Sequence, residues 1–186
     1  MIKKINIITK ENKYSIEIEV NSIKKKIKNI ISNNSNVIFL IDKKIFNVFQ
    51  TINNYKKQKY ICINCSEKIK SFKFYNKLTQ EILRKGVDRK TVIVAIGGGT
   101  LGDLSGFIAS TLLRGVDLIL VPTTLLAQVD SSIGGKNGIN TSFGKNLIGT
   151  FYQPKLVIID PAFLVTLPQR ELLSGYAEIV KHSIIY

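Results

Sequence analysis

Two patterns of apolar and polar positions alternate along the 186 residues of the chain. Short, nearly continuous apolar runs recur, and each indicates a strand that is buried on both faces of a parallel sheet. Between these runs, apolar residues recur at three- and four-residue spacing, which indicates helices of about ten to fifteen residues. Strands that alternate with helices of this length are typical of βαβ units. We therefore predict one α/β domain with a largely parallel sheet.

The predicted elements begin with an N-terminal hairpin and end with a helix. Residues 5–20 contain two strands around a Lys-Glu-Asn-Lys turn, and alternation from Tyr14 to Val20 leaves one face of the second strand exposed. Ser22 is the expected N-cap of a helix over residues 23–31. Further strands are expected at 37–42, 60–64, 91–96, 118–122 and 156–161, and further helices from about 43, over 71–85, after the glycines at 97–99, and from about 169.

The α/β domain is expected to cover residues 1–168, because no repeat or low-complexity linker interrupts it. The last helix, from about Gln169, meets no glycine, capping residue or proline before Tyr186. We therefore interpret residues 169–186 as the start of a second, truncated unit.

Three consecutive glycines, Gly97 to Gly99, follow the apolar run that ends at Ile96. Glycines at this point allow a tight turn and let backbone amides approach a ligand. The start of the helix that follows is a natural anion site, because its first N–H groups are unpaired. Asp103 is expected in the first turn of this helix. The glycine run alone is equally compatible with an ordinary turn before an acidic helix start.

The residues after this helix extend the argument for an anionic ligand. Lysines bind phosphate as point charges, and aspartate and asparagine bind hydroxyls. Such residues suit a phosphorylated, polyhydroxylated substrate. The polar residues of this short span are Thr123, Thr124, Asp130, Lys136, Lys145 and Asn146.

Several short motifs, beginning with the glycine run, occur in order: GGGTLGD, RG, VPTTLLAQVDSSIGGK, GKNLIG, FYQPK, TLP-R-E and G-AE-VK. From roughly Val92 to the C-terminus, this order resembles 3-dehydroquinate synthase, of the sugar phosphate cyclase superfamily. The resemblance implies a Rossmann-like NAD-binding domain, followed by the first helix of a mostly α-helical domain that binds metal and substrate. It also implies conversion of 3-deoxy-D-arabino-heptulosonate 7-phosphate to 3-dehydroquinate and phosphate, in the shikimate pathway of aromatic amino acid biosynthesis. NAD serves this family as a catalytic oxidant, with zinc or cobalt as the divalent metal.

The resemblance assigns the cofactor to several segments. The glycine turn places backbone amides on the NAD pyrophosphate, and an E-x-x-K motif binds the adenosine end, although Ser66 replaces the usual preceding glycine. Asp42 is a candidate ribose ligand by the rule for acidic residues at strand ends, although an exposed strand-end carboxylate has the same pattern. The cofactor-binding residues are therefore Asp42, Ser66, Glu67, Lys70, Gly99, Thr100, Leu101, Gly102, Asp103, Thr123, Thr124, Lys136, Lys145, Phe163, Leu164, Val165 and Thr166.

The substrate ligands implied by the resemblance bind hydroxyls, carboxylate and phosphate. Arg114 resembles an arginine that reaches the phosphate from the neighbouring subunit, which implies a homodimer, although an arginine that only solvates a helix end has the same pattern. The catalytic residues are therefore Arg114, Asp130, Lys136, Lys145, Asn146 and Lys181.

Glu178 is the metal ligand that the resemblance implies within these residues. On a helix, Glu178 and Lys181 are three positions apart and face one cleft. The two histidine ligands of the family belong to the helical domain beyond these residues, and one carboxylate cannot make a three-ligand zinc site. We interpret His182 as a residue of the helix surface. The chain alone is therefore expected to bind NAD, to bind zinc weakly, and to form no detectable 3-dehydroquinate.

Positive charge is concentrated in the first half of the chain. Residues 1–90 hold 21 lysines and arginines and 7 acidic residues, whereas residues 91–186 hold 6 of each. A basic half can bind nucleic acid or a membrane surface, but these lysines are not interleaved with aromatic residues. No apolar run reaches the roughly 18 residues of a membrane span, and no secretory signal is found. We therefore expect a cytoplasmic protein that binds neither nucleic acid nor membranes.

Cys62 and Cys65 form one C-x-x-C pair, a spacing found in redox centres and in half of a zinc site. No second pair occurs, and the chain has a single histidine. Because Cys62 lies within the apolar run YICIN, we expect it to be a small buried residue with a structural role.

The sequence leaves three hypotheses. The chain is an intact 3-dehydroquinate synthase or a fragment of one, another sugar phosphate cyclase, or a non-catalytic remnant or basic binding protein. The GGG-x-x-x-D and PTT patterns also resemble metal-dependent polyol dehydrogenases, but VDSSIGGK and GKN argue against these enzymes. Retention of the whole set of active-site motifs favours the first hypothesis.

Overall fold

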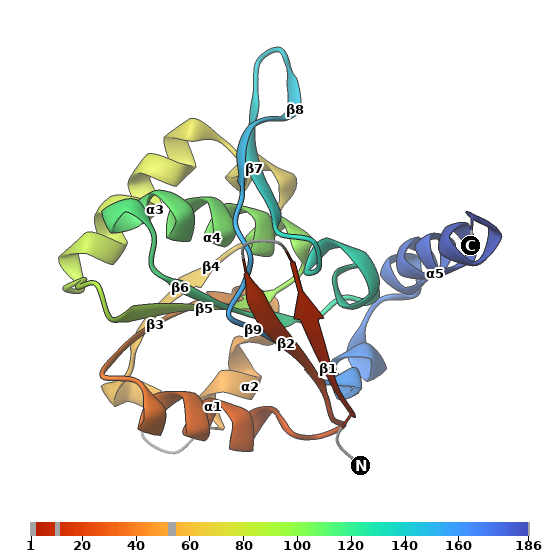
Figure 1. The fold of residues 1–186 in the computed structure, drawn as a ribbon, viewed down its shortest axis with the longest axis horizontal. Helices are drawn as coiled ribbons and strands as arrows, with labels where there is room; N and C mark the ends of the chain where they lie inside the picture. Colours follow the sequence, from red (N-terminus) through yellow and green to blue (C-terminus); the bar gives the residue numbers. More distant parts are fainter. Residues whose placement is uncertain (1–2, 10–11, 52–54, 186) are drawn as a thin grey trace.

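The computed structural model describes residues 3–9, 12–51 and 55–185, so two residues of the predicted first turn, 10 and 11, lie outside the described residues. Its main feature is a seven-stranded sheet in the order β1-β2-β9-β6-β5-β3-β4 (Figure 1). β1 and β2 pair antiparallel, as the predicted hairpin, and the other neighbouring pairs are parallel. The strands are β1 (Lys3–Ile8), β2 (Lys13–Ile18), β3 (Asn36–Asp42), β4 (Lys59–Ile63), β5 (Thr91–Gly97), β6 (Asp117–Pro122) and β9 (Leu156–Ile159). The predicted α/β sheet is confirmed.

Helices cover both faces of this sheet (Figure 1). α1 (Ile23–Asn33) and α2 (Phe46–Gln50) pack on one face, and α3 (Phe72–Arg84) and α4 (Gly99–Thr111) pack on the other. Successive side chains of a strand point to opposite faces, so β5 supplies both cores. Val92 and Val94 join the core beside α1, whereas Ile93 and Ala95 join the core beside α4. Because helices bury both faces of β5, its sequence is a continuous apolar run.

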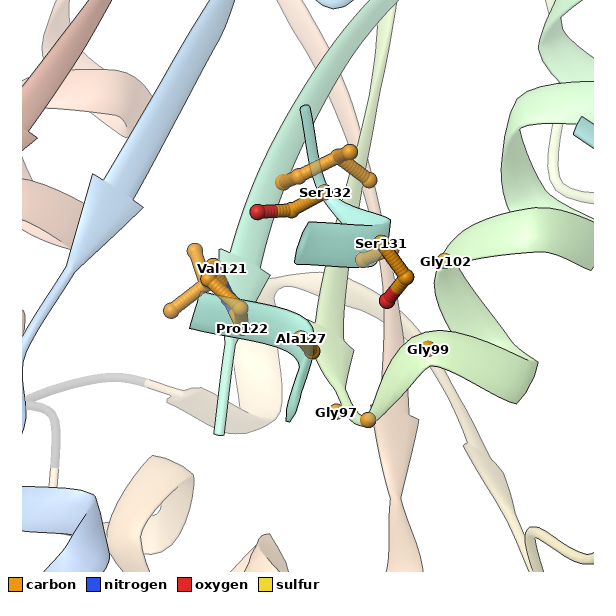
Figure 2. A pocket seen from close by; sticks show the side chains of 11 residues that line it. Gly97, Gly99, Gly102, Val121, Pro122, Ala127, Ser131 and Ser132 are labelled. Carbon is orange, nitrogen blue, oxygen red and sulfur yellow. The ribbon is translucent and has the colours of Figure 1, made fainter. Parts of the chain in front are cut away.

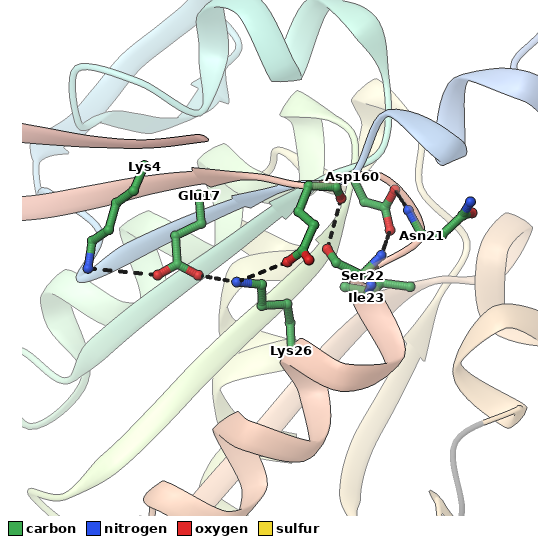
Figure 3. Close-up of polar contacts among 8 residues, drawn as sticks. Lys4, Glu17, Asn21, Ser22, Ile23, Lys26 and Asp160 are labelled. Atoms are coloured by element: carbon green, nitrogen blue, oxygen red, sulfur yellow. Dashed lines mark hydrogen bonds and ion pairs between the residues drawn. The ribbon is translucent and has the colours of Figure 1, made fainter. Parts of the chain in front are cut away.

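Ser22 does not cap α1, which corrects the prediction. Its backbone is already helical, with φ −96° and ψ −14°, and its hydroxyl donates to the carbonyl of Glu19 at 2.8 Å. Asp160, which directly follows β9, caps the helix instead (Figure 3). Its carboxylate accepts hydrogen bonds from the backbone N–H groups of Asn21, Ser22 and Ile23 at 2.8, 2.8 and 3.1 Å. The cap therefore comes from more than a hundred residues away, which local spacing cannot reveal.

The helix expected from about Lys43 is shorter than its pattern indicates. It consists of a 3-10 turn (Lys43–Ile45) followed directly by the five residues of α2. The carboxylate of Asp42 accepts a hydrogen bond from the Lys44 amide at 3.0 Å and so caps this turn. The chain therefore leaves β3 through a short capped turn rather than a full helix.

A two-stranded sheet, absent from the predicted elements, projects from the body of the molecule (Figure 1). It consists of β7 (Lys136–Thr141) and β8 (Gly144–Phe151), which pair antiparallel. Its base packs on α4, where Gly106 leaves room for the side chain of Asn137 and Thr150 donates to the Ser110 hydroxyl at 3.0 Å. The two strands are rich in glycine and asparagine, which are depleted in strands, so their sequence pattern is weak.

The last helix, α5 (Gln169–Ile185), begins where the sequence predicts and extends away from the sheet (Figure 1). Gly175 is its buried residue, and a Cβ there would lie 2.6 Å from the backbone nitrogen of Leu126. α5 therefore packs closely on the segment that follows β6. Within the described part of the chain, no helix is long and apolar enough to cross a membrane.

Candidate active site

Three parallel strands end side by side where the candidate residues gather. β3 ends at Asp42, β5 ends at Gly97, and β6 ends at Pro122, which Thr123 follows. The amide of Thr123 donates to the Gly97 carbonyl at 3.0 Å and so extends the pairing of β5 with β6. The carboxyl edge of a parallel sheet is where doubly wound folds bind their ligands.

α4 begins at the glycine turn, as predicted, but the glycines provide space rather than unusual backbone angles. Gly98 is the N-cap, with φ −79° and ψ −179°, and no side chain of the described residues caps the helix. A Cβ on Gly98 would lie 3.1 Å from the Thr124 methyl carbon, and a Cβ on Gly99 would lie 2.5 Å from the Ser131 hydroxyl oxygen. The helix start thus combines uncapped N–H groups with an open backbone, as an anion site requires.

A small pocket of about 10 Å³ adjoins the glycine turn (Figure 2). Gly97, Gly99 and Gly102 line it together with Ser131 and Ser132. The hydroxyls of both serines are buried and have no hydrogen-bond partner within the described residues. This volume is that of about one water molecule, so the pocket is too small for a cofactor.

A cavity of about 700 Å³ adjoins the other side of the same turn. Ten predicted cofactor residues line it: Asp42, Ser66, Glu67, Gly99, Thr100, Leu101, Thr123, Thr124, Phe163 and Thr166. The last two belong to η6 (Pro161–Thr166), a 3-10 turn whose N-cap is Asp160. Lys44, Cys65 and Arg170 also line the cavity, although they were not predicted as cofactor ligands. Arg170 lies in the TLP-R-E motif and Cys65 in the C-x-x-C pair, whereas Lys44 belongs to no recognised motif. The volume is within the range of about 300–1,000 Å³ that ligand pockets occupy.

Lys70 does not line this cavity but bridges three elements. Its side chain is 5% exposed, and its ammonium contacts Asp103 Oδ2 on α4 and Asn146 Oδ1 on β8, each at 2.5 Å. Asp103 is the fifth residue of α4, so it lies in the second helical turn rather than the predicted first turn. Burial raises the pKa of the Asp103 carboxyl, and the hydrogen bond and charge of Lys70 oppose this rise without cancelling it. Lys70 therefore connects α4, through the ion pair, to β8, through the hydrogen bond to Asn146.

A second cavity, of about 680 Å³, lies beside α4, the β7–β8 hairpin and η5 (Ala127–Ser131). η5 is a π-helical turn that carries Asp130, and such turns are rare and frequent at functional sites. Buried Gln128 holds this turn by donating to the carbonyls of Pro122 and Asp160 at 3.2 and 3.3 Å. The cavity presents groups that can bind both hydroxyls and an anion, from the predicted residues Asp103, Asp130, Lys136 and Asn146.

α5 brings Glu178 next to Asp130. His182, one helical turn beyond Glu178, has its Nε2 3.4 Å from Glu178 Oε1 and 3.9 Å from Asp130 Oδ1. Lys181 forms an ion pair with the same Glu178 oxygen. His182 is partly exposed, as expected for the helix surface, but it faces both carboxylates. Carboxylate oxygens and an imidazole nitrogen are donors that zinc and cobalt accept, so these residues fit the metal that the resemblance implies.

Besides Lys70, Gly102, Glu178 and Lys181, four further predicted residues line neither of the two large cavities. Arg114 lies in the 3-10 turn between α4 and the start of β6, at the opposite edge of the sheet. It has a φ of 69°, a left-handed conformation that residues other than glycine rarely adopt. Lys145 is exposed on β8, and Leu164 and Val165 are not among the residues that line the cavity beside Phe163.

The two cysteines differ in environment. β4 is an edge strand that buries Ile61 and Ile63 and turns Cys62 outward, so the predicted burial of Cys62 is wrong. Cys65 is partly buried in the wall of the large cavity, and burial raises the pKa of its thiol. Both cysteines are free. A thiol with a raised pKa is a poor nucleophile and metal ligand.

A doubly wound parallel sheet, with an uncapped glycine turn and two polar cavities at its carboxyl edge, defines the class of Rossmann-like α/β proteins. Residues 60–174 match the family described as 3-dehydroquinate synthase N-terminal. The chain belongs to this family.

Individual relatives agree with this assignment. The chain is 45% identical over 184 residues to the 3-dehydroquinate synthase of Dictyoglomus thermophilum. This alignment covers 99% of the chain and 52% of the relative. A 2-deoxy-scyllo-inosose synthase, solved with carbaglucose-6-phosphate, NAD+ and Co2+, matches 96% of this chain and 50% of its own, with TM-score 0.85 and 27% identity. A 2-epi-5-epi-valiolone synthase from Streptomyces hygroscopicus, with NAD+ and Zn2+ bound, matches 94% and 50%, with TM-score 0.82 and 28% identity. The chain spans about half the length of these relatives.

Proposed function

We propose that the chain is the cofactor-binding half of a 3-dehydroquinate synthase. This lyase of the shikimate pathway converts 3-deoxy-D-arabino-heptulosonate 7-phosphate to 3-dehydroquinate and phosphate. The observation that carries the proposal is the convergence of the family motifs on two cavities that share α4. The identity of 45% to a 3-dehydroquinate synthase exceeds the 27% to an inosose synthase, which favours this substrate over that of another cyclase.

NAD and a divalent metal are the proposed cofactors, as in the two solved cyclases. NAD occupies the cavity of about 700 Å³, with its pyrophosphate on the uncapped N–H groups at Gly99 and Thr100. The positive end of the α4 dipole favours an anion there. Asp42, at the end of β3, accepts a hydrogen bond from a ribose hydroxyl. NAD supplies a reversible hydride acceptor for one ring hydroxyl of the substrate.

The substrate occupies the cavity of about 680 Å³. Lys136 supplies positive charge for the phosphate, and Asp130 and Asn146 hydrogen-bond the hydroxyls. A ketone next to a C–H bond makes that hydrogen acidic, so phosphate elimination needs only modest base catalysis, and the departing phosphate can take the proton. These residues therefore act mainly by positioning and by electrostatic stabilisation. Glu178 holds the metal, which contributes Lewis-acid chemistry at the hydroxyl.

The proposed enzyme is a cytoplasmic homodimer with two domains. Arg114 lies at the sheet edge opposite the cavities, which supports its assignment to the phosphate site of a neighbouring subunit. Residues 1–168 form the NAD-binding domain, and residues 169–186, which contain α5, begin the helical domain for metal and substrate.

A chimera tests the proposed function. The chain is joined after α5 to the remaining half of the Dictyoglomus thermophilum relative, which lies beyond the 52% that aligns. We expect phosphate release and 3-dehydroquinate formation by the chimera with NAD and Zn2+, and neither by the 186-residue chain alone.

Lys136→Met in the chimera tests whether the substrate binds in the cavity that Lys136 lines. Loss of a charged hydrogen bond is expected to lower kcat/KM by about 10- to 100-fold, because such a bond contributes about 1.5–3 kcal/mol. A folded, NAD-binding chimera that processes only the substrate of another cyclase would refute the assignment.

A further inference from the structure

The β7–β8 hairpin contains a bulge at the residues that face the cavity of about 680 Å³. The register shifts between Ile139 and Thr141, so the single residue Asn140 of β7 lies opposite residues 145–147 of β8. Bulges are frequent beside active sites, where they re-aim a side chain. The bulged segment contains Asn146, whose φ of 57° is left-handed. Such a backbone persists only when its surroundings hold it.

The side chain of Asn140 holds this segment. Its Oδ1 accepts a hydrogen bond from the Asn146 backbone amide at 2.9 Å, at the point where the bulge interrupts the strand ladder. Its Nδ2 donates to Oε1 of Glu67 at 2.7 Å, and its backbone amide donates to the Lys70 carbonyl at 2.7 Å. Because an ionised carboxylate only accepts hydrogen bonds, the Asn140 amide group has one orientation.

The two partners of the Asn140 side chain belong to different cavities. Glu67 lines the cavity of about 700 Å³ that the proposed function assigns to NAD, whereas Asn146 lines the cavity of about 680 Å³ that it assigns to the substrate. Lys70 joins the same two segments a second time, since its ammonium contacts Asn146 Oδ1 at 2.5 Å. Asn140 is therefore the middle of a series of hydrogen bonds that runs from one cavity to the other.

The hydrogen bonds of the Asn140 side chain to Glu67 and Asn146 are both exposed to solvent. Such bonds contribute little by themselves because water competes for the same groups. Holding the Glu67 side chain in one rotamer also costs conformational entropy. A ligand that covers Glu67 excludes water and orders this side chain, so the bond to Asn140 becomes stronger when the cavity is filled.

We propose that Asn140 is a positioning residue that couples the cofactor cavity to the substrate cavity. This inference builds on the proposed function, from which it takes NAD as the ligand beside Glu67. When NAD orders Glu67, Asn140 holds the bulge in the orientation that presents Asn146 to the substrate. Asn140 itself contacts neither molecule and acts through the hydrogen bond to the Asn146 amide.

Amide hydrogen exchange of the full 186-residue chain, followed for each residue by NMR, tests this coupling without any measurement of turnover. We expect saturating NAD to slow exchange of the Asn146 backbone amide by about 5-fold or more, the lower end of typical coupling between sites. Asn140→Asp keeps the acceptor for this amide but loses the donor to Glu67 and places two carboxylates together. We expect this variant still to bind NAD, but its Asn146 amide no longer to respond.

Two further variants give the experiment a rescue and a control. Asn140→Asp/Glu67→Gln exchanges the two groups, so the new amide at position 67 donates to the carboxylate at position 140. This variant is expected to recover the response to NAD, which a purely structural role of Asn140 would not restore. Asn29→Asp makes the same chemical change on α1, on the other face of the sheet, and is expected to respond like the unaltered chain. Circular dichroism establishes that each variant is folded.

Calorimetry with NAD under the same conditions separates the two ways in which the account can fail. NAD binding that leaves exchange of the Asn146 amide unchanged overturns the inference and leaves the proposed function standing. A full response in Asn140→Asp, or no recovery in Asn140→Asp/Glu67→Gln, overturns the inference in the same way. A folded, unaltered chain that binds no NAD overturns the proposed function as well.

Discussion

Gly99 and Gly102 both lie in α4 but differ in the space around them. A Cβ on Gly99 would meet the Ser131 hydroxyl oxygen at 2.5 Å, whereas no neighbouring group in the described part of the chain lies within 4 Å of a Cβ on Gly102. Alanine restricts the unfolded chain at either position, which stabilises the fold by about 0.5–1 kcal/mol where there is room. We expect this gain in the free energy of unfolding for Gly102→Ala and a smaller gain or a loss for Gly99→Ala. Urea unfolding measures both, and equal gains would argue against the close approach.

Lys70 and Asp103 form an ion pair whose side chains are 5% and 22% exposed. Removing one partner of a buried pair destabilises by about 3–5 kcal/mol, because the other charge remains unpaired. Asp103 keeps some contact with solvent, so we expect Lys70→Met to lower the free energy of unfolding by about 3 kcal/mol. Lys70→Met/Asp103→Leu is expected to lie within about 1 kcal/mol of the unaltered chain. A double-mutant cycle by urea unfolding checks this, and strictly additive losses would show that the pair is not coupled.

Residues differ in how much of their role the sequence reveals. Asp42 and Thr123 directly follow strand cores, so their place at the carboxyl edge could be predicted from the strand pattern. The partners of Lys70 are 33 and 76 positions away, and only the fold brings them together. The four-residue spacing of His182 from Glu178 is visible in the sequence, but the approach of His182 to Asp130 depends on how α5 packs on η5.

At the scale of elements, Asp160 joins three segments of the chain. Besides capping α1, its carboxylate accepts a hydrogen bond from the Ala162 amide at the start of η6, at 3.0 Å. Asp160→Asn exchanges one acceptor oxygen for a donor group, and hydrogen bonds to a charged group are worth about 1.5–3 kcal/mol. We expect a loss of about 2–3 kcal/mol in the free energy of unfolding, measured by urea denaturation.

Ser22→Ala is the matched control for this cap. It removes only the hydrogen bond from the Ser22 hydroxyl to the Glu19 carbonyl, and we expect a loss of about 1 kcal/mol. A larger loss for Ser22→Ala than for Asp160→Asn would restore the predicted role of Ser22 as the cap.

Elements with a strong hydrophobic pattern are predictable, and those without one are not. β3 and β5 are buried along nearly their whole length, and their apolar runs locate them within a residue or two. β8 is exposed along most of its length, so it lacks the alternation that marks a strand against a core. Its position depends on pairing with β7 and on the hydrogen bond from Thr150 to Ser110 of α4, neither of which is a local property.

At the scale of the whole molecule, part of the basic charge has structural partners. Lys26 on α1 is 12% exposed and contacts Glu17 at 2.6 Å and Glu19 at 3.5 Å (Figure 3). Lys4 on β1 contacts Glu17 as well, at 3.9 Å. These ion pairs connect the N-terminal hairpin to α1. The absence of nucleic-acid binding stays a prediction.

The central claim is that this chain forms a working NAD site. Isothermal titration calorimetry of the purified 186-residue chain with NAD tests it most directly. We predict saturable binding of one NAD per chain, and its loss in Gly99→Val, whose side chain would meet Ser131 and displace the helix start that receives the pyrophosphate. Glu81→Gln on α3 changes a carboxylate outside both cavities and is predicted to bind NAD like the unaltered chain. A sample that circular dichroism shows to be folded, but that takes up no NAD, would contradict the account.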